Sequence, residues 1–158
     1  MSPLDGIVRV VADSDLDGLM AAAVLKASNP QIEVHFAHPA LLRGGSLDHL
    51  IDRSTAICDL PFHPNCGWYL DHHQTNRPTN EEEKDFIASG GICNWEASPS
   101  AARVAYDLLS QSIDLSHLEE EARSEFNESH VLEDGDKLWF AAVGAGWTWG
   151  AGVMSWEN

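Results

Sequence analysis

The stretch IVRVVADSDLDGLMAAAVLKA, residues 7–27, contains the change from strand to helix that decides the fold. Its first part, Ile7–Ala12, is a short run rich in β-branched residues, which is typical of a buried parallel strand. A polar turn, Asp13–Gly18, then leads into Leu19–Ala27, which is strongly helix-forming and apolar nearly all round. A strand, a polar turn and a buried helix in this order predict the opening of a βαβ unit.

Three further segments have the character of short strands. Gln31–His38 alternates between apolar and polar residues, whereas Thr55–Asp59 and Gly67–Leu70 are short apolar runs. Ser46–Ile51 is expected to form a short helix, and the polar, turn-rich segment Arg77–Asp85 is expected to be a surface loop. These segments predict an α/β fold, with a mostly parallel, Rossmann-like sheet flanked by helices.

The second half of the chain is expected to add two helices and a hairpin. Ser98-Pro99 has the pattern of a helix start, and Ser116 with Glu119 has that of a capping box before a short acidic helix. Farther on, Lys137–Val143 and Gly150–Trp156 flank a glycine- and tryptophan-rich segment, which predicts a two-stranded hairpin.

The expected domains are an α/β domain over residues 1–130 and a hairpin tail over residues 131–158. An exposed tryptophan-rich hairpin would be prone to association, so we expect this tail to be buried, and a homodimer is one way of burying it.

Composition and charge exclude several classes of function. The 158 residues include 9 basic and 25 acidic ones, a formal net charge of −16, so the chain has no cation surplus for binding long duplex nucleic acid. Three cysteines at irregular spacing suggest neither a disulfide framework nor a zinc ribbon, which fits a reducing cytoplasm. We recognise no signal peptide and no apolar run that could span a bilayer. The expectation is a cytoplasmic protein with no membrane partner.

Acidic and histidine side chains follow three of the expected strands. They are Asp13, Asp15 and Asp17 after the first strand, Asp59 after the third, and Asp71, His72 and His73 after the fourth. The carboxyl ends of parallel strands share one rim of a sheet, so these side chains are expected to converge there. So many carboxylates would repel one another strongly unless divalent cations bound between them. Carboxylates with one or two imidazoles suit Mn²⁺ or Mg²⁺.

Each of these signals is weak when taken alone. An Asp-Gly pair is commonly a turn, and DSDLDG lacks the glutamate of a calcium-binding loop at the twelfth position. Their order along the chain is more specific, because four motifs together resemble the DHH phosphoesterase superfamily over roughly residues 7–115. The motifs are DSDLDGLMAAAVL at 13–25, CDL at 58–60, DHHQ at 71–74 and SPSAARVAYDLL at 98–109.

The resemblance implies a role for each residue of this constellation. Asp13, Asp15, Asp17 and His72 match metal ligands of the family, and Asp59 matches the aspartate that bridges two metal ions. His73 matches the histidine that contacts the scissile phosphate or the leaving group. Asp71 matches the acid that begins the signature, and is expected to assist catalysis by orienting an imidazole.

The implied activity is hydrolysis of a phosphoester or phosphoanhydride with two ions of Mn²⁺ or Mg²⁺. His73 would act as a charge stabiliser or general acid. The substrate would be a small phosphate compound or a nucleotide, and pyrophosphate, a short oligonucleotide, a cyclic dinucleotide and a phosphonucleoside all stay open.

The chain also departs from the family pattern, which leaves two alternatives open. Members usually carry a further metal-binding aspartate and a second, glycine-rich domain, and Asp114, Asp134 and Asp136 have no matching context. A degenerate module that binds a nucleotide or a partner is therefore one alternative, and it would bind one Mn²⁺ or none. Residues 132–156 resemble the closing hairpin of ketoacyl-carrier-protein synthase III, so an acyl-transfer accessory protein is the other.

Overall fold

A computed structural model describes the backbone of residues 4–110, 137–144 and 148–155, and the side chains of residues 4–110. The chain divides into two compact units, Met1–Ile113 and Asp114–Asn158, and each is described by itself. The expected domain boundary at residues 130 and 131 lies outside the described residues, and so does the capping box at Ser116 and Glu119.

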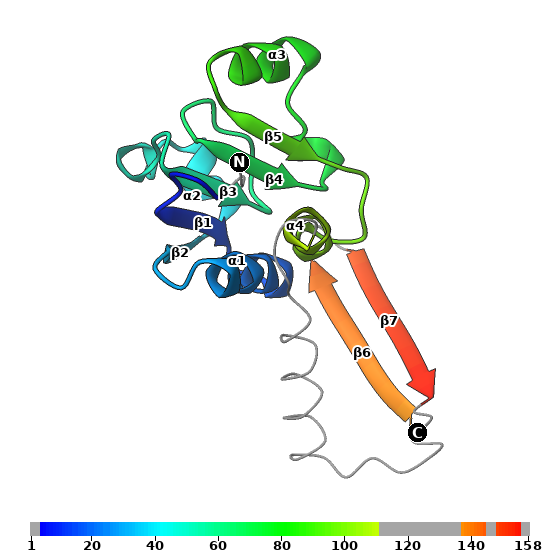
Figure 1. The fold of residues 1–158 in the computed structure, drawn as a ribbon. Helices are drawn as coiled ribbons and strands as arrows, with labels where there is room; N and C mark the ends of the chain where they lie inside the picture. Colours follow the sequence, from blue (N-terminus) through cyan, green and yellow to red (C-terminus); the bar gives the residue numbers. More distant parts are fainter. Residues whose placement is uncertain (1–3, 111–136, 145–147, 156–158) are drawn as a thin grey trace. The chain divides into compact units, whose positions relative to one another are not determined.

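The first unit is built on a sheet of five parallel strands (Figure 1). The strands are β1 (Arg9–Asp13), β2 (Glu33–Ala37), β3 (Thr55–Cys58), β4 (Trp68–Asp71) and β5 (Ile92–Trp95). Their spatial order is β2-β1-β3-β4-β5, and every neighbouring pair is parallel. The predicted α/β class with a parallel sheet is therefore confirmed.

This strand order fixes where a ligand can bind. The chain runs outward from β1 to β2, then returns past β1 to β3 and continues to β5, so the order reverses between β1 and β3. In open α/β sheets, ligands bind at such a switch point, outside the carboxyl ends of the strands. Asp13 is the last residue of β1, and Asp59 directly follows β3. Both carboxylates therefore lie at the switch point.

Helices cover the sheet on both faces. They are α1 (Leu16–Ser28), α2 (Pro39–Arg43), α3 (Asn80–Ala88) and α4 (Ala101–Leu109), together with two 3-10 turns, η1 (Asp48–Leu50) and η2 (Gln74–Asn76). Helix α1 packs on β1, β2 and β3, and α4 packs on β4 and on α1 (Figure 1). On the other face, Leu42 of α2 and Phe86 of α3 pack in one apolar cluster with Val11, Ile57 and Tyr69 of the sheet.

Helix α1 is buried on one side only, which corrects the expectation of a buried helix. Its small residues Gly18, Ala21 and Ala22 face the interior, whereas Leu16 and Met20 are more than half exposed. A Cβ on Gly18 would overlap the backbone carbonyl oxygen of Asp13. The glycine of the Asp-Gly pair therefore lets the first turn of α1 approach the end of β1.

Several expected boundaries were wrong. The expected loop Arg77–Asp85 contains most of helix α3, whose start is stabilised by a full capping box between Thr79 and Glu82. Strand β5 was not expected, and helix α4 begins two residues later than the Ser98-Pro99 pattern indicated, with Ser100 as its N-cap. In place of a helix over Ser46–Ile51 the structure has the short turn η1, and α2 precedes it.

The second unit contains an antiparallel pair, β6 (Lys137–Gly144) and β7 (Thr148–Ser155). Ala141 lies opposite Ala151 in this pair, so the predicted hairpin is confirmed. The expected burial of its tryptophans lies outside the described side chains, and the homodimer and the cytoplasmic location stay predictions from the sequence. Within the described part of the chain, no helix is both long enough and apolar enough to cross a membrane.

Candidate metal centre

The loop after β1 supplies the first carboxylates of the site. Asp15 is the N-cap of α1, and one of its oxygens accepts a hydrogen bond from the amide of Gly18 at 3.0 Å. Asp13 is buried, and its Oδ1 accepts the amide proton of Ser14 at 2.6 Å. Burial raises the pKa of the Asp13 carboxyl, and the negative charge of Asp15 adds to the shift.

Asp59 follows β3 in a backbone conformation that few residues adopt. Its φ is +59°, in the left-handed region that aspartate and asparagine tolerate better than most side chains, while its amide still donates to Leu70 O at 3.0 Å. The side chain is buried, and neither carboxylate oxygen accepts a hydrogen bond of acceptable geometry from any residue that the structure describes. Nδ1 of His73 lies 3.2 Å from Oδ1, and its hydrogen bond goes to Asp71. Burial, reinforced by the charges of Asp17 and Asp15, raises the pKa of Asp59 to about 9. A buried carboxylate of this kind needs a cation or a proton beside it.

The ring of His72 is oriented by a backbone carbonyl. Its Nδ1 lies 3.0 Å from the carbonyl oxygen of Ser98, which can only accept, so Nδ1 carries a proton and the lone pair of the neutral ring is on Nε2. Nε2 is buried without a hydrogen-bond partner, 3.1 Å from Asp17 Oδ2 and 3.7 Å from Asp59 Oδ1. This is the tautomer that a metal-binding imidazole requires.

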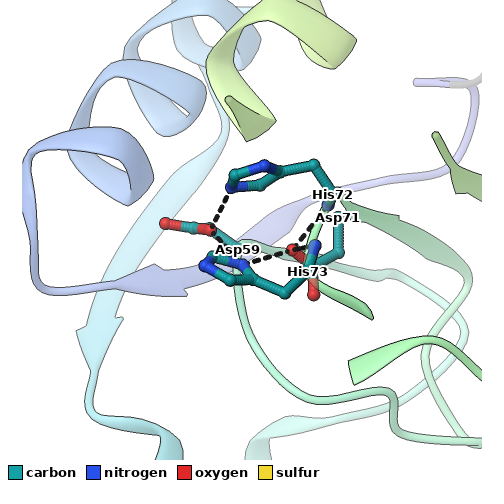
Figure 2. Close-up of side chains that lie close together, drawn as sticks. All are labelled: Asp59, Asp71, His72 and His73. Atoms are coloured by element: carbon teal, nitrogen blue, oxygen red, sulfur yellow. Dashed lines mark hydrogen bonds and ion pairs between the residues drawn. The ribbon is translucent and has the colours of Figure 1, made fainter. Parts of the chain in front are cut away.

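Asp71 holds the loop that carries both histidines (Figure 2). It is fully buried, and its Oδ1 accepts the amide protons of His72 at 2.7 Å and His73 at 3.1 Å and the Nδ1 proton of His73 at 3.0 Å. Its Oδ2 lies 3.0 Å from the hydroxyl of Tyr69, whose single proton is donated either to this oxygen or to Asn76 O at 2.9 Å. With Nδ1 bonded to Asp71, the partly exposed ring of His73 presents Nε2 as its free nitrogen.

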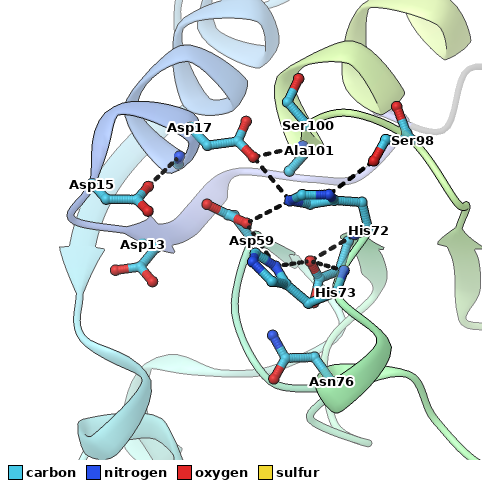
Figure 3. A network of polar contacts seen from close by, with 12 residues as sticks. Asp13, Asp15, Asp17, Asp59, His72, His73, Asn76, Ser98, Ser100 and Ala101 are labelled. Carbon is cyan, nitrogen blue, oxygen red and sulfur yellow. Dashed lines mark hydrogen bonds and ion pairs between the residues drawn. The ribbon is translucent and has the colours of Figure 1, made fainter. Parts of the chain in front are cut away.

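Asp17 connects the site to helix α4 (Figure 3). Its two oxygens accept the amide protons of Ala101 and Ala102 at 2.8 and 2.9 Å, at the positive end of the helix dipole. Because a carboxylate oxygen has two lone pairs, each oxygen can still accept a second bond. One of them already lies beside His72.

The donor atoms form two sets that have Asp59 in common. One set is Asp13, Asp15 and Asp59, the other is Asp59, Asp71, His72 and His73, and within each set the ligand atoms lie within 4.8 Å of one another. The bare oxygens of Asp59 and the bare Nε2 of His72 fit a divalent cation, and the oxygen-rich donor set suits a hard metal ion. All seven residues singled out from the sequence therefore meet at one rim, whereas Asp114, Asp134 and Asp136 lie outside the described residues.

Sequence reasoning missed the residues that orient this site. Tyr69 could have been found, because alternation along a strand places residues i and i+2 on the same face and so puts its hydroxyl near Asp71. The carbonyl of Ser98 and the amides of Ala101 and Ala102 had no such signal, since their contacts span 26 to 85 residues of sequence.

A search of solved structures finds a pGpG-specific phosphodiesterase, PggH, from Vibrio cholerae. The TM-score is 0.51 and the sequence identity is 26%, over 80% of this chain and 38% of that one. A scan of protein-family models and a search of curated proteins give no match. The resemblance of residues 132–156 to ketoacyl-carrier-protein synthase III gains no support from these comparisons. The chain is thus similar, over less than half of that protein's length, to a pGpG-specific phosphodiesterase.

Proposed function

We propose that this chain is a metal-dependent phosphoesterase of the DHH superfamily that acts on a small nucleotide. The observation that carries the proposal is Asp59, a buried carboxylate shared by two ligand sets, with no hydrogen bond to either oxygen among the described residues. The similarity to a phosphodiesterase supports the reaction class.

Two groups of residues would hold the metal ions. Asp13, Asp15 and Asp59 would bind one ion. Asp59 and His72 of the second set would bind the other, with Asp17, whose Oδ2 lies 3.1 Å from His72 Nε2, in place of Asp71, whose oxygens already accept hydrogen bonds. Ions of Mn²⁺ or Mg²⁺ would supply positive charge for the phosphate oxygens and activate water. Asp59 would be the bridging ligand.

The chain's own side chains then orient the reacting groups. The carbonyl of Ser98 keeps the proton of His72 on Nδ1, so that Nε2 stays available as a ligand. Asp71 holds the ring of His73 through Nδ1 and stabilises the form of the ring that carries a proton on both nitrogens. In that form, Nε2 of His73 can donate its proton to the leaving oxygen or to the phosphate. Asp71 acts through His73 and is a positioning residue.

Hydrolysis of pGpG in the presence of Mn²⁺ tests the proposal. We expect wild-type protein to release nucleoside monophosphates and Asp59→Asn to lose at least about a hundredfold of the rate, since the bridging charge is gone. Asp85→Asn, which changes an exposed acid on α3, is the matched control and should keep full activity. Hydrolysis by Asp59→Asn at the wild-type rate would contradict the proposal.

Metal content provides a second, independent measurement. Elemental analysis after equilibration with Mn²⁺ should give two ions per chain in the wild type and fewer in Asp59→Asn. One ion or none in the wild type, with no hydrolysis, would instead identify a degenerate binding module.

A further inference from the structure

Two arginines are attached to the segment that carries His73. Arg43, at the end of α2, donates through Nη2 to the side-chain oxygen of Asn76 at 3.1 Å. The guanidinium of Arg77 lies over the ring of Trp95, 4.3 Å from its centroid, and the indole of Trp95 donates to His73 O at 2.9 Å. Arg43 contacts a residue 33 positions away in the sequence, and Arg77 contacts one 18 positions away. Two cations therefore lie at the loop that follows the DHH motif.

The segment between His73 and Arg77 is itself well anchored. The amide of Asn76 donates to His73 O at 3.1 Å, and the hydroxyl of Tyr69 lies 2.9 Å from Asn76 O. Figure 3 shows the Asn76 side chain next to the ring of His73. A group bound by Arg43 would therefore lie near the histidine that faces the substrate.

These two arginines differ in their partners from four of the other five basic residues whose side chains the structure describes; the fifth, Lys84, belongs to α3. Arg9 and Arg103 pair with Glu33 and Asp107, and Lys26 and Arg53 donate to backbone carbonyls. In the part of the chain that the structure describes, neither Arg43 nor Arg77 forms an ion pair with a carboxylate. In a chain of net charge −16, two exposed guanidinium groups beside the site keep their charge available for another anion.

The chemistry of both guanidinium groups favours phosphate. Arg43 uses one of its five N–H donors on Asn76, and stacking on Trp95 occupies a face of Arg77 and leaves its N–H edges open. A guanidinium group binds phosphate oxygens through two parallel hydrogen bonds, which a carboxamide or a hydroxyl cannot reproduce.

We infer that Arg43 and Arg77 bind a second phosphate of the substrate, one that is not cleaved, and so select short oligonucleotides that carry a terminal phosphate. The inference rests on the proposed function, because it names the substrate class of the same site. In this inference the two arginines determine substrate specificity, whereas the acids and histidines of the metal centre carry out the reaction.

The pair pGpG and GpG tests this, because the two differ only in the terminal phosphate. Equilibrium binding is measured with Ca²⁺ in place of Mn²⁺, and initial rates with Mn²⁺. We expect the wild type to prefer pGpG, and Arg43→Ala or Arg77→Ala each to weaken pGpG binding roughly tenfold, about the effect of one charge-assisted contact. Binding of GpG, which has no terminal phosphate, should weaken much less than binding of pGpG.

The matched control is Arg103→Ala, which removes an exposed arginine on α4 that is paired with Asp107 and should change neither affinity. Arg43→Lys should recover part of the preference, because the charge stays and the paired donors do not. If the arginines only stabilise the loop, both variants will weaken pGpG and GpG equally, and the inference is overturned.

Two further outcomes separate this inference from its foundation. An arginine-dependent preference for pGpG without hydrolysis would refute the proposed function and leave the phosphate site standing. Hydrolysis of pGpG and GpG at equal kcat/KM would refute the phosphate site and leave the proposed function standing. Hydrolysis of inorganic pyrophosphate is the last comparison. If its rate depends on the two arginines and the preference for pGpG does not, the arginines bind the second phosphate of a phosphoanhydride. The assignment to oligonucleotides is then wrong.

Discussion

Asp59 is the residue at which burial and charge conflict most strongly. Its carboxylate is almost completely buried, has Asp15 and Asp17 close by, and accepts no hydrogen bond within the described part of the chain. Its backbone also has a positive φ, which carries a conformational cost. Unfavourable burial and an unusual backbone at one residue are typical of a functional site, where a bound ligand compensates for both.

Replacing Asp59 by Asn should therefore stabilise the metal-free protein. The amide is neutral and tolerates the left-handed backbone, so we expect the free energy of unfolding in EDTA to rise by about 1–3 kcal/mol. Thermal unfolding with and without Mn²⁺ measures this. The wild type should gain stability from Mn²⁺ through binding to the native state, and Asp59→Asn should not.

The control for that experiment is Asp85→Asn, since Asp85 is exposed on α3. It should unfold like the wild type under both conditions. A metal-free Asp59→Asn protein that is less stable than the wild type would show that Asp59 has a favourable partner without any metal.

At the scale of secondary structure, the start of helix α4 is stabilised by two different residues. Ser100 is the local N-cap and accepts the amide proton of Arg103 at 3.0 Å. Asp17, from α1, accepts the amide protons of Ala101 and Ala102. The first contact is local, whereas the second joins the two helices beside His72, so α4 and the site should respond to the same substitution.

We expect Asp17→Asn to lower the free energy of unfolding by about 1–2 kcal/mol, and Ser100→Ala by about 1 kcal/mol. Only Asp17→Asn should also reduce the stabilisation by Mn²⁺, since only Asp17 lies near the ligand atom of His72. Amide hydrogen exchange provides the local measurement. Exchange at Ala101 and Ala102 should accelerate in Asp17→Asn, and unchanged rates would exclude the contact between α1 and α4 in solution.

At the scale of the whole molecule, the parallel sheet and both ligand sets belong to the unit Met1–Ile113. A fragment of residues 1–113 should therefore unfold cooperatively and should be stabilised by Mn²⁺. Circular dichroism during thermal unfolding measures both properties, with the same fragment carrying Asp59→Asn as the control. A fragment without a cooperative transition would show that residues 114–158 are needed for folding.

The central strands and the edge elements differ in how well the sequence predicts them. Strands β1, β3 and β4 are buried, so they appear as short apolar runs. Strand β5 is more exposed and depends on pairing with β4, and α3 is mostly polar, with Phe86 as its buried anchor. Tertiary contacts and a capping box stabilise these two elements, and an apolar pattern therefore does not reveal them.

The amino-acid sequence alone determined which chemical groups this protein has and in what order they follow the strands. It placed Asp13, Asp59 and Asp71 at strand ends because the apolar runs stop there. Only the tertiary structure decided that Asp59 has bare oxygens, that Asp71 lies beside four donor groups and that Arg43 meets Asn76. The reason is physical: strand ends follow from local hydrophobicity, whereas the partners of a buried polar group come from distant segments that only folding brings together.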